Sequence, residues 1–163
     1  MRMIRLIMVA ITVVGFLIFG YPLLMIQNAI GKKDARKRDV QSLKIVKGVF
    51  SLILRIAGVT VTVKGEENIP KDQAVLYVGN HRSYFDILVG YTTVPGLMGF
   101  VAKSEMKKIP LLRSWMENVN CLFLDRKDIK AGLKMILEGI EKVKSGISVW
   151  IFPEGTRNRN EDI

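Results

Sequence analysis

Cysteine and histidine are almost absent from this chain of 163 residues, which contains one of each, Cys121 and His81. A single cysteine excludes an internal disulfide and is typical of a reducing compartment, and Cys121 lies in an apolar run where we expect it to pack. The sequence also lacks a C-x-x-C pair, an H-E-x-x-H helix and any cluster of histidines, so we expect no metal. His81 is the only imidazole that the chain can bring to a site.

Acidic residues are scarce beside basic ones. The chain has 15 Asp and Glu against 25 Lys and Arg, which gives a net charge of +10, and its mean hydropathy is +0.24. A basic and apolar chain is expected to meet an anionic membrane surface or an anionic lipid. No basic segment carries the interleaved aromatic residues of a base-stacking platform, so we expect no nucleic-acid partner.

Charge is nearly missing from the N-terminal segment. Between residues 6 and 26 the only ionisable side chain is that of Tyr21, and such a run is long enough to cross a hydrocarbon core of about 30 Å as a helix. Gly20-Tyr21-Pro22 interrupts the run, so a kinked span and a re-entrant hairpin both remain open. A cleaved signal peptide is disfavoured, because no small-x-small cleavage site follows the run.

A basic cluster at residues 31–38 follows the apolar run. The positive-inside rule then predicts a protein of the cell membrane whose body and active site lie on the cytoplasmic face. The cluster would also bind anionic headgroups. Residues 40–57 have helical spacing, which fits either a core helix or a helix in the membrane interface, and the interface is favoured. Residues 1–57 are thus predicted to form a membrane-associated helical segment.

Strands and helices alternate in residues 58–163. The strict alternation at 59–63 predicts a strand with one wet face, and the apolar run at 74–78 predicts a buried strand. Further strands are predicted at 97–102, 119–124 and 147–152, and helices at about 84–91, 109–118 and 128–144. This order is typical of one α/β domain in which helices flank a largely parallel sheet.

The stretch that carries chemistry is Asn80-His81-Arg82-Ser83-Tyr84-Phe85-Asp86, at a predicted strand-to-helix turn. One interpretation is a helix start, in which Asp86 bonds the Ser83 N–H and His81 is an ordinary loop residue. In the other, Asp86 reaches back to one ring nitrogen of His81, and the second nitrogen takes a proton from a substrate hydroxyl. Asp86 can do both, and spacing alone does not decide.

Cations follow several of the predicted strands, as His81 does: Lys103, Arg126 and Arg157. Sites in open α/β sheets form outside the carboxyl ends of the strands, so a base and three cations are expected to converge on one crevice. Such a set suits a hydroxyl-bearing anionic substrate such as a phosphate ester. The alternative is that these cations are solvated loop residues.

These motifs resemble those of the glycerolipid acyltransferases. Residues 80–86 are similar to the NHx4D motif, Phe152-Pro153-Glu154-Gly155-Thr156-Arg157 to FPEGTR, Phe123-Leu124-Asp125-Arg126 to the central F-x-x-R block, and Ala102-Lys103-Ser104-Glu105 to the segment before that block. The resemblance covers about residues 40–160 and is closest to the members that acylate 1-acylglycerol-3-phosphate. The family continues beyond FPEGTR with a further apolar block, so we expect the C-terminal part of the domain to be missing from this chain.

The resemblance implies a membrane-bound enzyme that makes phosphatidic acid. His81 would be the general base on the free hydroxyl of lysophosphatidic acid, Asp86 would orient it, and acyl-CoA or acyl carrier protein would donate the acyl group without a cofactor or an acyl-enzyme. The implied substrate-binding residues are Lys103, Arg126, Glu154, Gly155, Thr156 and Arg157. Another lysophospholipid acceptor and a catalytically inert, basic membrane-binding module remain as alternatives.

Overall fold

Two helices meeting at a sharp bend open the chain. The computed structural model describes residues 2–158, beginning with α1 (Arg2–Phe19) and α2 (Tyr21–Gly31), whose axes differ by 51°. Gly20 lies at the bend, where a Cβ would collide with the carbonyl oxygen of Phe16. Within residues 2–158 neither helix alone is long and apolar enough to cross a membrane, whereas the bent pair together meets that requirement. The interruption predicted at Gly20-Tyr21-Pro22 is found as this bend, which fits a kinked span and a re-entrant hairpin equally.

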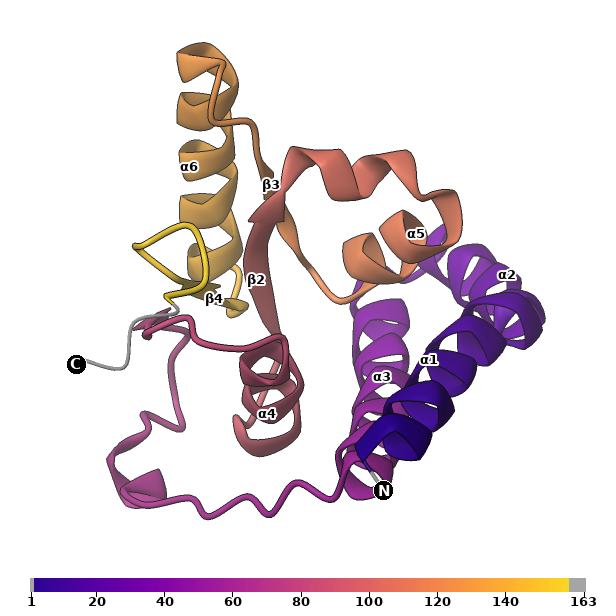
Figure 1. Ribbon diagram of the computed structural model, residues 1–163. Coiled ribbons are helices and arrows are strands. Elements are labelled where there is room, and N and C mark those ends of the chain that lie inside the picture. Colours follow the sequence, from indigo (N-terminus) through magenta and orange to yellow (C-terminus); the bar gives the residue numbers. More distant parts are fainter. Residues whose placement is uncertain (1, 159–163) are drawn as a thin grey trace.

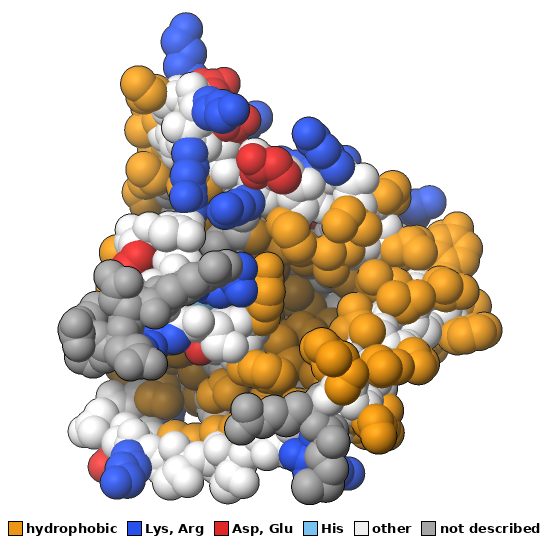
Figure 2. All heavy atoms as spheres, viewed as in Figure 1, with side chains coloured by type: hydrophobic (Ala, Val, Ile, Leu, Met, Phe, Trp, Pro, Cys, Tyr) orange, Lys and Arg blue, Asp and Glu red, His pale blue; other side chains and the backbone are white. Residues whose placement is uncertain are grey.

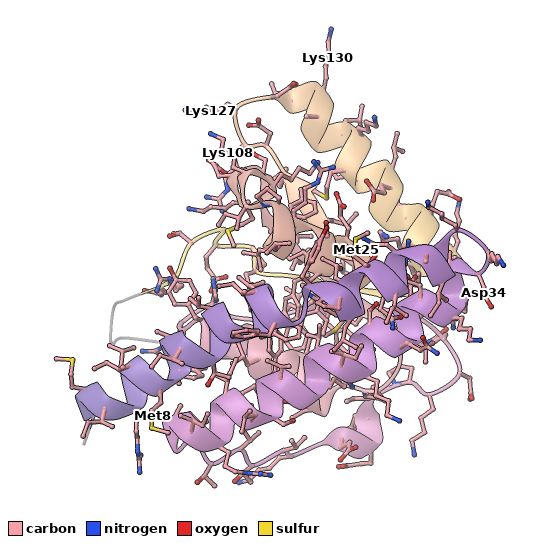
Figure 3. The ribbon with its side chains drawn as sticks, turned by 90° about the vertical axis from the view of Figure 1, so that its right-hand side faces the viewer. Met8, Met25, Asp34, Lys108, Lys127 and Lys130 are labelled. Carbon is pink, nitrogen blue, oxygen red and sulfur yellow. The ribbon has the colours of Figure 1, made fainter. Side chains whose placement is uncertain are left out.

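The third helix, α3 (Ala35–Ala57), packs against α1, α2 and α4 (Phe85–Thr93). Four apolar residues on one face of it are buried, namely Leu43, Val46, Ile53 and Leu54, whereas Val40 and Leu52 are exposed. Lys47 donates from Nζ to the Val94 carbonyl at the end of α4, 2.7 Å away, and partial burial lowers the pKa of this ammonium group. The face of α3 that carries Leu43 and Val46 packs in the protein's own core, which fits the core-helix alternative for residues 40–57. Figure 3 shows α3 running alongside α1 and α2.

Extended backbone without a strand follows α3. Gly58 ends the helix with φ 72°, and the chain then runs to the short η1 (Glu66–Asn68). The strand predicted at 59–63 is wrong, since these residues form none and the side chains from Thr60 to Val63 are exposed. The alternating pattern favours a pleated surface, but without a neighbouring strand it gains no hydrogen-bonded ladder.

A four-stranded parallel sheet forms the centre of the remaining chain. Its order is β1 (Leu76–Val78), β4 (Ser148–Ile151), β2 (Met98–Lys103) and β3 (Leu122–Leu124). The connections contain α4, η2 (Ser104–Lys108) with α5 (Pro110–Asn118), and α6 (Ile129–Lys144). Figure 1 shows α6 on one side of the sheet and α1 to α3 on the other. The predicted α/β class with a parallel, helix-flanked sheet is confirmed.

Two apolar surfaces of this part face outward. Leu76 and Val78 of β1 are 55% and 61% exposed, so the prediction of a buried strand is wrong: β1 is an edge strand with a neighbour on one side only. The helix predicted at 128–144 is found as α6, capped by Asp128, yet Ile129 is 90% exposed and Leu133 58%. An apolar stripe at helical spacing therefore predicts a helix here without predicting what covers it.

The core lies between the sheet and helices α3 to α5. Tyr91, Phe100, Trp115 and Leu122 are almost completely buried there. Cys121 is buried among them, with its Sγ 3.3 Å from the Tyr91 hydroxyl, and burial raises the pKa of both groups. Cys121 thus packs as expected.

Candidate active site

Three donors converge on a single carboxylate oxygen in the turn between β1 and α4. Asp86 Oδ2 accepts from the backbone N–H groups of Arg82 at 2.7 Å and Ser83 at 2.8 Å, and it lies 2.9 Å from His81 Nδ1. Asp86 therefore closes the helix start and contacts the imidazole at the same time, so the two interpretations of this motif coexist. A carboxylate at Nδ1 selects the tautomer that carries its proton there and leaves the Nε2 lone pair available.

The imidazole of His81 is held on a second side by the segment that follows β4. Its ring stacks on Phe152 with 4.2 Å between centroids and 13° between planes, and the side chain is only 15% exposed. The His81 N–H donates to Glu154 Oε1 at 3.1 Å, and its carbonyl accepts from the Asn158 N–H at 2.7 Å. Within residues 2–158 no residue hydrogen-bonds to Nε2. Glu154 thus connects the loop after β4 to the turn that carries His81.

Arg126 lies directly beside Gly155. A Cβ built on Gly155 would lie 2.7 Å from Arg126 Nη2, and the glycine has φ 62°. An L side chain at this position would be strained by the backbone and would also displace the guanidinium. The structure therefore brings the F-x-x-R block and the FPEGTR segment together at the carboxyl edge of the sheet.

Arg157 reaches the other motif through an aromatic ring. Its guanidinium carbon lies 3.8 Å from the ring centroid of Tyr84, a residue that is 66% exposed. This distance is that of a cation–π contact, and a guanidinium can bind an oxyanion through two parallel N–H groups. Sequence reasoning missed Tyr84, although an exposed aromatic inside the histidine motif was a signal for it.

In the described part of the chain the two remaining predicted residues, Lys103 and Thr156, do not contact the turn that carries His81 through a hydrogen bond or an ion pair. Lys103 ends β2 in register with Leu124, so it lies on the same sheet edge as Arg126, and it is exposed. Thr156 is exposed in the loop after β4. Within residues 2–158 neither side chain makes a hydrogen bond or ion pair with the other site residues. Lys103 therefore shares the carboxyl edge of the sheet with Arg126. Among the described residues, Lys103 and Thr156 are not joined to the other predicted residues by direct bonds.

A hydrophobic recess opens on one face of the molecule. Figure 2 shows a hollow lined mainly by hydrophobic side chains beside the helices on the right of the view. Two open cavities lie elsewhere: one of about 330 Å³ between α2, α3 and α5, and one of about 230 Å³ between η2 and α6. Neither is lined by His81 or by any predicted site residue.

This arrangement combines an oriented base with positive charge. The carboxylate of Asp86 would stabilise the imidazolium that forms when Nε2 takes a proton. The guanidinium group of Arg126 lies beside Gly155 in the loop after β4. That of Arg157 lies over Tyr84 in the turn at 80–86. The chemistry that fits is deprotonation of a hydroxyl on a substrate that also carries an oxyanion.

Comparisons with known proteins agree with this chemistry. The acyltransferase family model matches residues 60–163. The 1-acyl-sn-glycerol-3-phosphate acyltransferase of Borreliella burgdorferi is 31% identical, over 72% of this chain and 47% of its own length. The probable 1-acyl-sn-glycerol-3-phosphate acyltransferase of Mycoplasma pneumoniae is 35% identical, over 70% and 44%. The chain spans about half the length of the curated relatives it matches.

A solved structure is similar over almost the whole chain. The crystal structure of the 1-acyl-sn-glycerophosphate (LPA) acyltransferase PlsC from Thermotoga maritima matches with a TM-score of 0.76 and 29% identity. The match covers 98% of this chain and 65% of that one. It therefore includes the N-terminal helices as well as the sheet.

Proposed function

The chain belongs to the acyltransferase family, and from that premise we propose that it moves a fatty acyl group from a thioester to the free hydroxyl of 1-acylglycerol-3-phosphate, giving phosphatidic acid. The observation that carries this proposal is the contact of Asp86 Oδ2 with His81 Nδ1, beside arginines on both neighbouring loops. The names of the relatives support the choice of acceptor.

In the proposed reaction one proton moves from the acceptor hydroxyl to Nε2 of His81 and then to the leaving thiolate. Nε2 of His81 takes the hydroxyl proton as the oxygen bonds to the thioester carbon, and Asp86 offsets the charge on the imidazolium. When the tetrahedral intermediate collapses, the C–S bond breaks and the imidazolium returns the proton to the leaving thiolate. No acyl-enzyme forms, and no cofactor takes part.

The phosphate of the acceptor would be bound by Arg126 and Arg157, with Lys103 adding charge at the same sheet edge. Arg157 lies over the ring of Tyr84, and its guanidinium can bind an oxyanion with two parallel N–H groups. Anchoring the phosphate fixes where the hydroxyl lies relative to Nε2, which is how binding energy away from the reacting atoms raises the rate. Acyl-CoA and acyl carrier protein present the same thioester, and the recess in Figure 2 suits the acyl chain of either.

We further propose that α1 and α2 dock the protein on an anionic membrane, on its cytoplasmic face. Figure 3 shows the two helices running side by side with α3 on the face toward the viewer, with Asp34 at the turn into α3. This turn lies within the basic cluster 31–38. The exposed hydrophobic side chains on this layer include Ile4, Leu6, Ile11, Ile18, Phe19 and Ile26. Acceptor and product are both lipids, so a bilayer under the site would deliver one and receive the other.

Vesicle binding tests the docking. Replacing Ile11 and Phe19 by aspartate is expected to lower partition into vesicles of phosphatidylglycerol and phosphatidylcholine at least about tenfold, because each buried apolar side chain contributes about 1.5–3 kcal/mol. The matched control replaces Ile129 and Leu133 of α6, which are also exposed, and should partition as the wild type does. Equal losses in both pairs, or none in either, would contradict docking through α1 and α2.

An acyl-transfer assay tests the activity itself. The protein is incubated with lysophosphatidic acid and either acyl-CoA or acyl carrier protein charged with the same chain, and product is identified by mass spectrometry. Phosphatidic acid is expected, with kcat/KM at least about tenfold higher than for a monoacylglycerol of the same chain, since a hydrogen bond to a charged group contributes about 1.5–3 kcal/mol.

The same assay separates the alternatives. Faster acylation of another lysophospholipid would show that this lipid, and not lysophosphatidic acid, is the preferred acceptor. Vesicle binding with no acyl transfer from either donor would leave a basic membrane-binding module in place of the proposed enzyme.

A further inference from the structure

Aromatic rings form a continuous row that ends on the imidazole. Tyr77 stacks on Trp150 at 5.3 Å, Trp150 on Phe100 at 5.3 Å, and Phe100 on Phe152 at 5.7 Å between ring centroids. The last step, from Phe152 to His81, is the shortest at 4.2 Å and the most nearly parallel at 13°. The face of His81 is therefore backed by a wall that runs through three strands of the sheet.

One short segment fixes His81 at three points. Phe152 follows β4 directly, Glu154 accepts from the His81 N–H, and the Asn158 N–H donates to the His81 carbonyl. The backbone and the ring face of His81 are thus held by the same loop. Any change in the distance between this loop and the turn at 80–86 would move both together.

The hydrogen bond to Asp86 leaves the imidazole of His81 free to tilt, and the ring of Phe152 restricts this tilt. A hydrogen bond at Nδ1 fixes one atom of the imidazole, but the ring can still tilt about the line from Nδ1 to Oδ2, and the outer torsion of histidine is intrinsically broad. A flat aromatic surface at van der Waals distance restricts that tilt. The direction of the Nε2 lone pair is then set, and a misplacement of about 1 Å at a reacting group costs about 10²-fold in rate.

We propose that Phe152 is a positioning residue, whose ring face holds the imidazole of His81 in the plane from which Nε2 meets the acceptor hydroxyl. This role rests on the proposed function of His81 as the general base. The competing explanation is that Phe152 only fills space between Phe100 and Trp150, in which case any apolar side chain of similar volume would serve.

Kinetics of three variants separate the two explanations. Phe152→Leu, which keeps an apolar side chain but no ring face, is expected to lower kcat about 10- to 100-fold while KM for lysophosphatidic acid changes less than about threefold. Phe152→Tyr keeps the face and should restore most of kcat. Tyr77→Leu removes the ring at the far end of the same row and should leave both constants near wild type. Thermal unfolding of each variant reports the loss of packing.

NMR of the imidazole gives a readout that does not depend on turnover. His81 is the only histidine in the chain, so its ring resonances need no assignment by mutation. Stacking on Phe152 is expected to shift the ring protons upfield, and the ¹⁵N resonances to show the proton on Nδ1. In Phe152→Leu the nitrogen resonances should still show the proton on Nδ1, because Asp86 is unchanged. The upfield shift should disappear, and the ring protons should lose their fixed nuclear Overhauser contacts with the residues around them, whereas the shift and these contacts should persist in Tyr77→Leu.

Each outcome decides the proposal. It is overturned if Phe152→Leu keeps the wild-type kcat and imidazole spectrum, if Phe152→Tyr is as impaired as Phe152→Leu, or if Tyr77→Leu has the same effect on the spectrum. Should the wild type transfer no acyl group, the proposed function fails by itself, and the NMR comparison alone then decides whether Phe152 orients the ring.

Discussion

Replacing His81 by alanine is expected to lower kcat for acyl transfer to lysophosphatidic acid by about 10²- to 10⁴-fold, the range that a general base contributes. No second imidazole exists in the chain to take over the proton. Asp86 cannot substitute for it, because its Oδ2 remains bound to the N–H groups of Arg82 and Ser83. KM for the acceptor should change little, since the arginines that bind phosphate are untouched. Steady-state kinetics with labelled donor measures both constants.

Chemical rescue distinguishes a lost base from a lost fold. Alanine vacates the space between Asp86 and Phe152, so added imidazole should restore part of kcat in His81→Ala and do nothing for the wild type. His81→Gln provides the second control, because glutamine can hydrogen-bond to Asp86 yet cannot take a proton, and it should be as slow as alanine. Turnover of His81→Ala at the wild-type rate would end the proposal that His81 is the base.

The part of the site that the sequence predicted is the part set by local geometry. His81, Ser83 and Asp86 lie within one turn and the start of one helix, so a strand followed by this motif leaves few places for the carboxylate to go. The helix-start interpretation and the imidazole-orienting interpretation of Asp86 were alternatives, yet one oxygen, Oδ2, makes both contacts. Two of the three donors to Asp86 are backbone N–H groups three and four residues before it, so the spacing placed the carboxylate at this turn without deciding whether it also contacts the imidazole.

The contacts made by the FPEGTR segment depend on the order of the strands. Glu154 and His81 are 73 residues apart, and they meet because β4 inserts between β1 and β2. Alternation of strands and helices predicts a parallel sheet without specifying that order. The contact of Phe152 with His81 could not be predicted for the same reason, because an apolar residue after a strand is usually core and only the strand order places the imidazole against it.

Burial was predicted wrongly where the sequence showed an apolar face but not which element would pack against that face. The residues at 59–63 alternate like a strand, yet no strand lies beside them. One apolar face of α3 is buried by protein, while the equally regular face of α6 is exposed. Periodicity states that a face is apolar, and the tertiary arrangement decides whether protein, lipid or water meets it.

Replacing Asp86 by asparagine should isolate the charge of the carboxylate from its hydrogen bonds. Two backbone N–H groups and the N–H of His81 converge on Oδ2, so the amide must place its oxygen there and turn its NH₂ away. The tautomer and the orientation of His81 are then preserved. Two unit charges about 4 Å apart at an effective dielectric constant of 20 interact by about 4 kcal/mol. Losing that stabilisation of the imidazolium predicts a fall in kcat of about 10²- to 10³-fold.

The unfolding temperature should separate Asp86→Asn from Asp86→Ala. Asparagine keeps an acceptor for both backbone N–H groups, so its thermal midpoint should stay near wild type, whereas alanine leaves them unpaired at a cost of about 1–3 kcal/mol. The matched control is Asp34→Asn, since Asp34 also accepts a backbone N–H at a helix start but lies far from His81, and its kcat should be unchanged. A wild-type kcat in Asp86→Asn would show that the carboxylate charge is not used. Equal destabilisation by asparagine and alanine would show instead that the amide does not take up the oxygen position on which the expected rate effect depends.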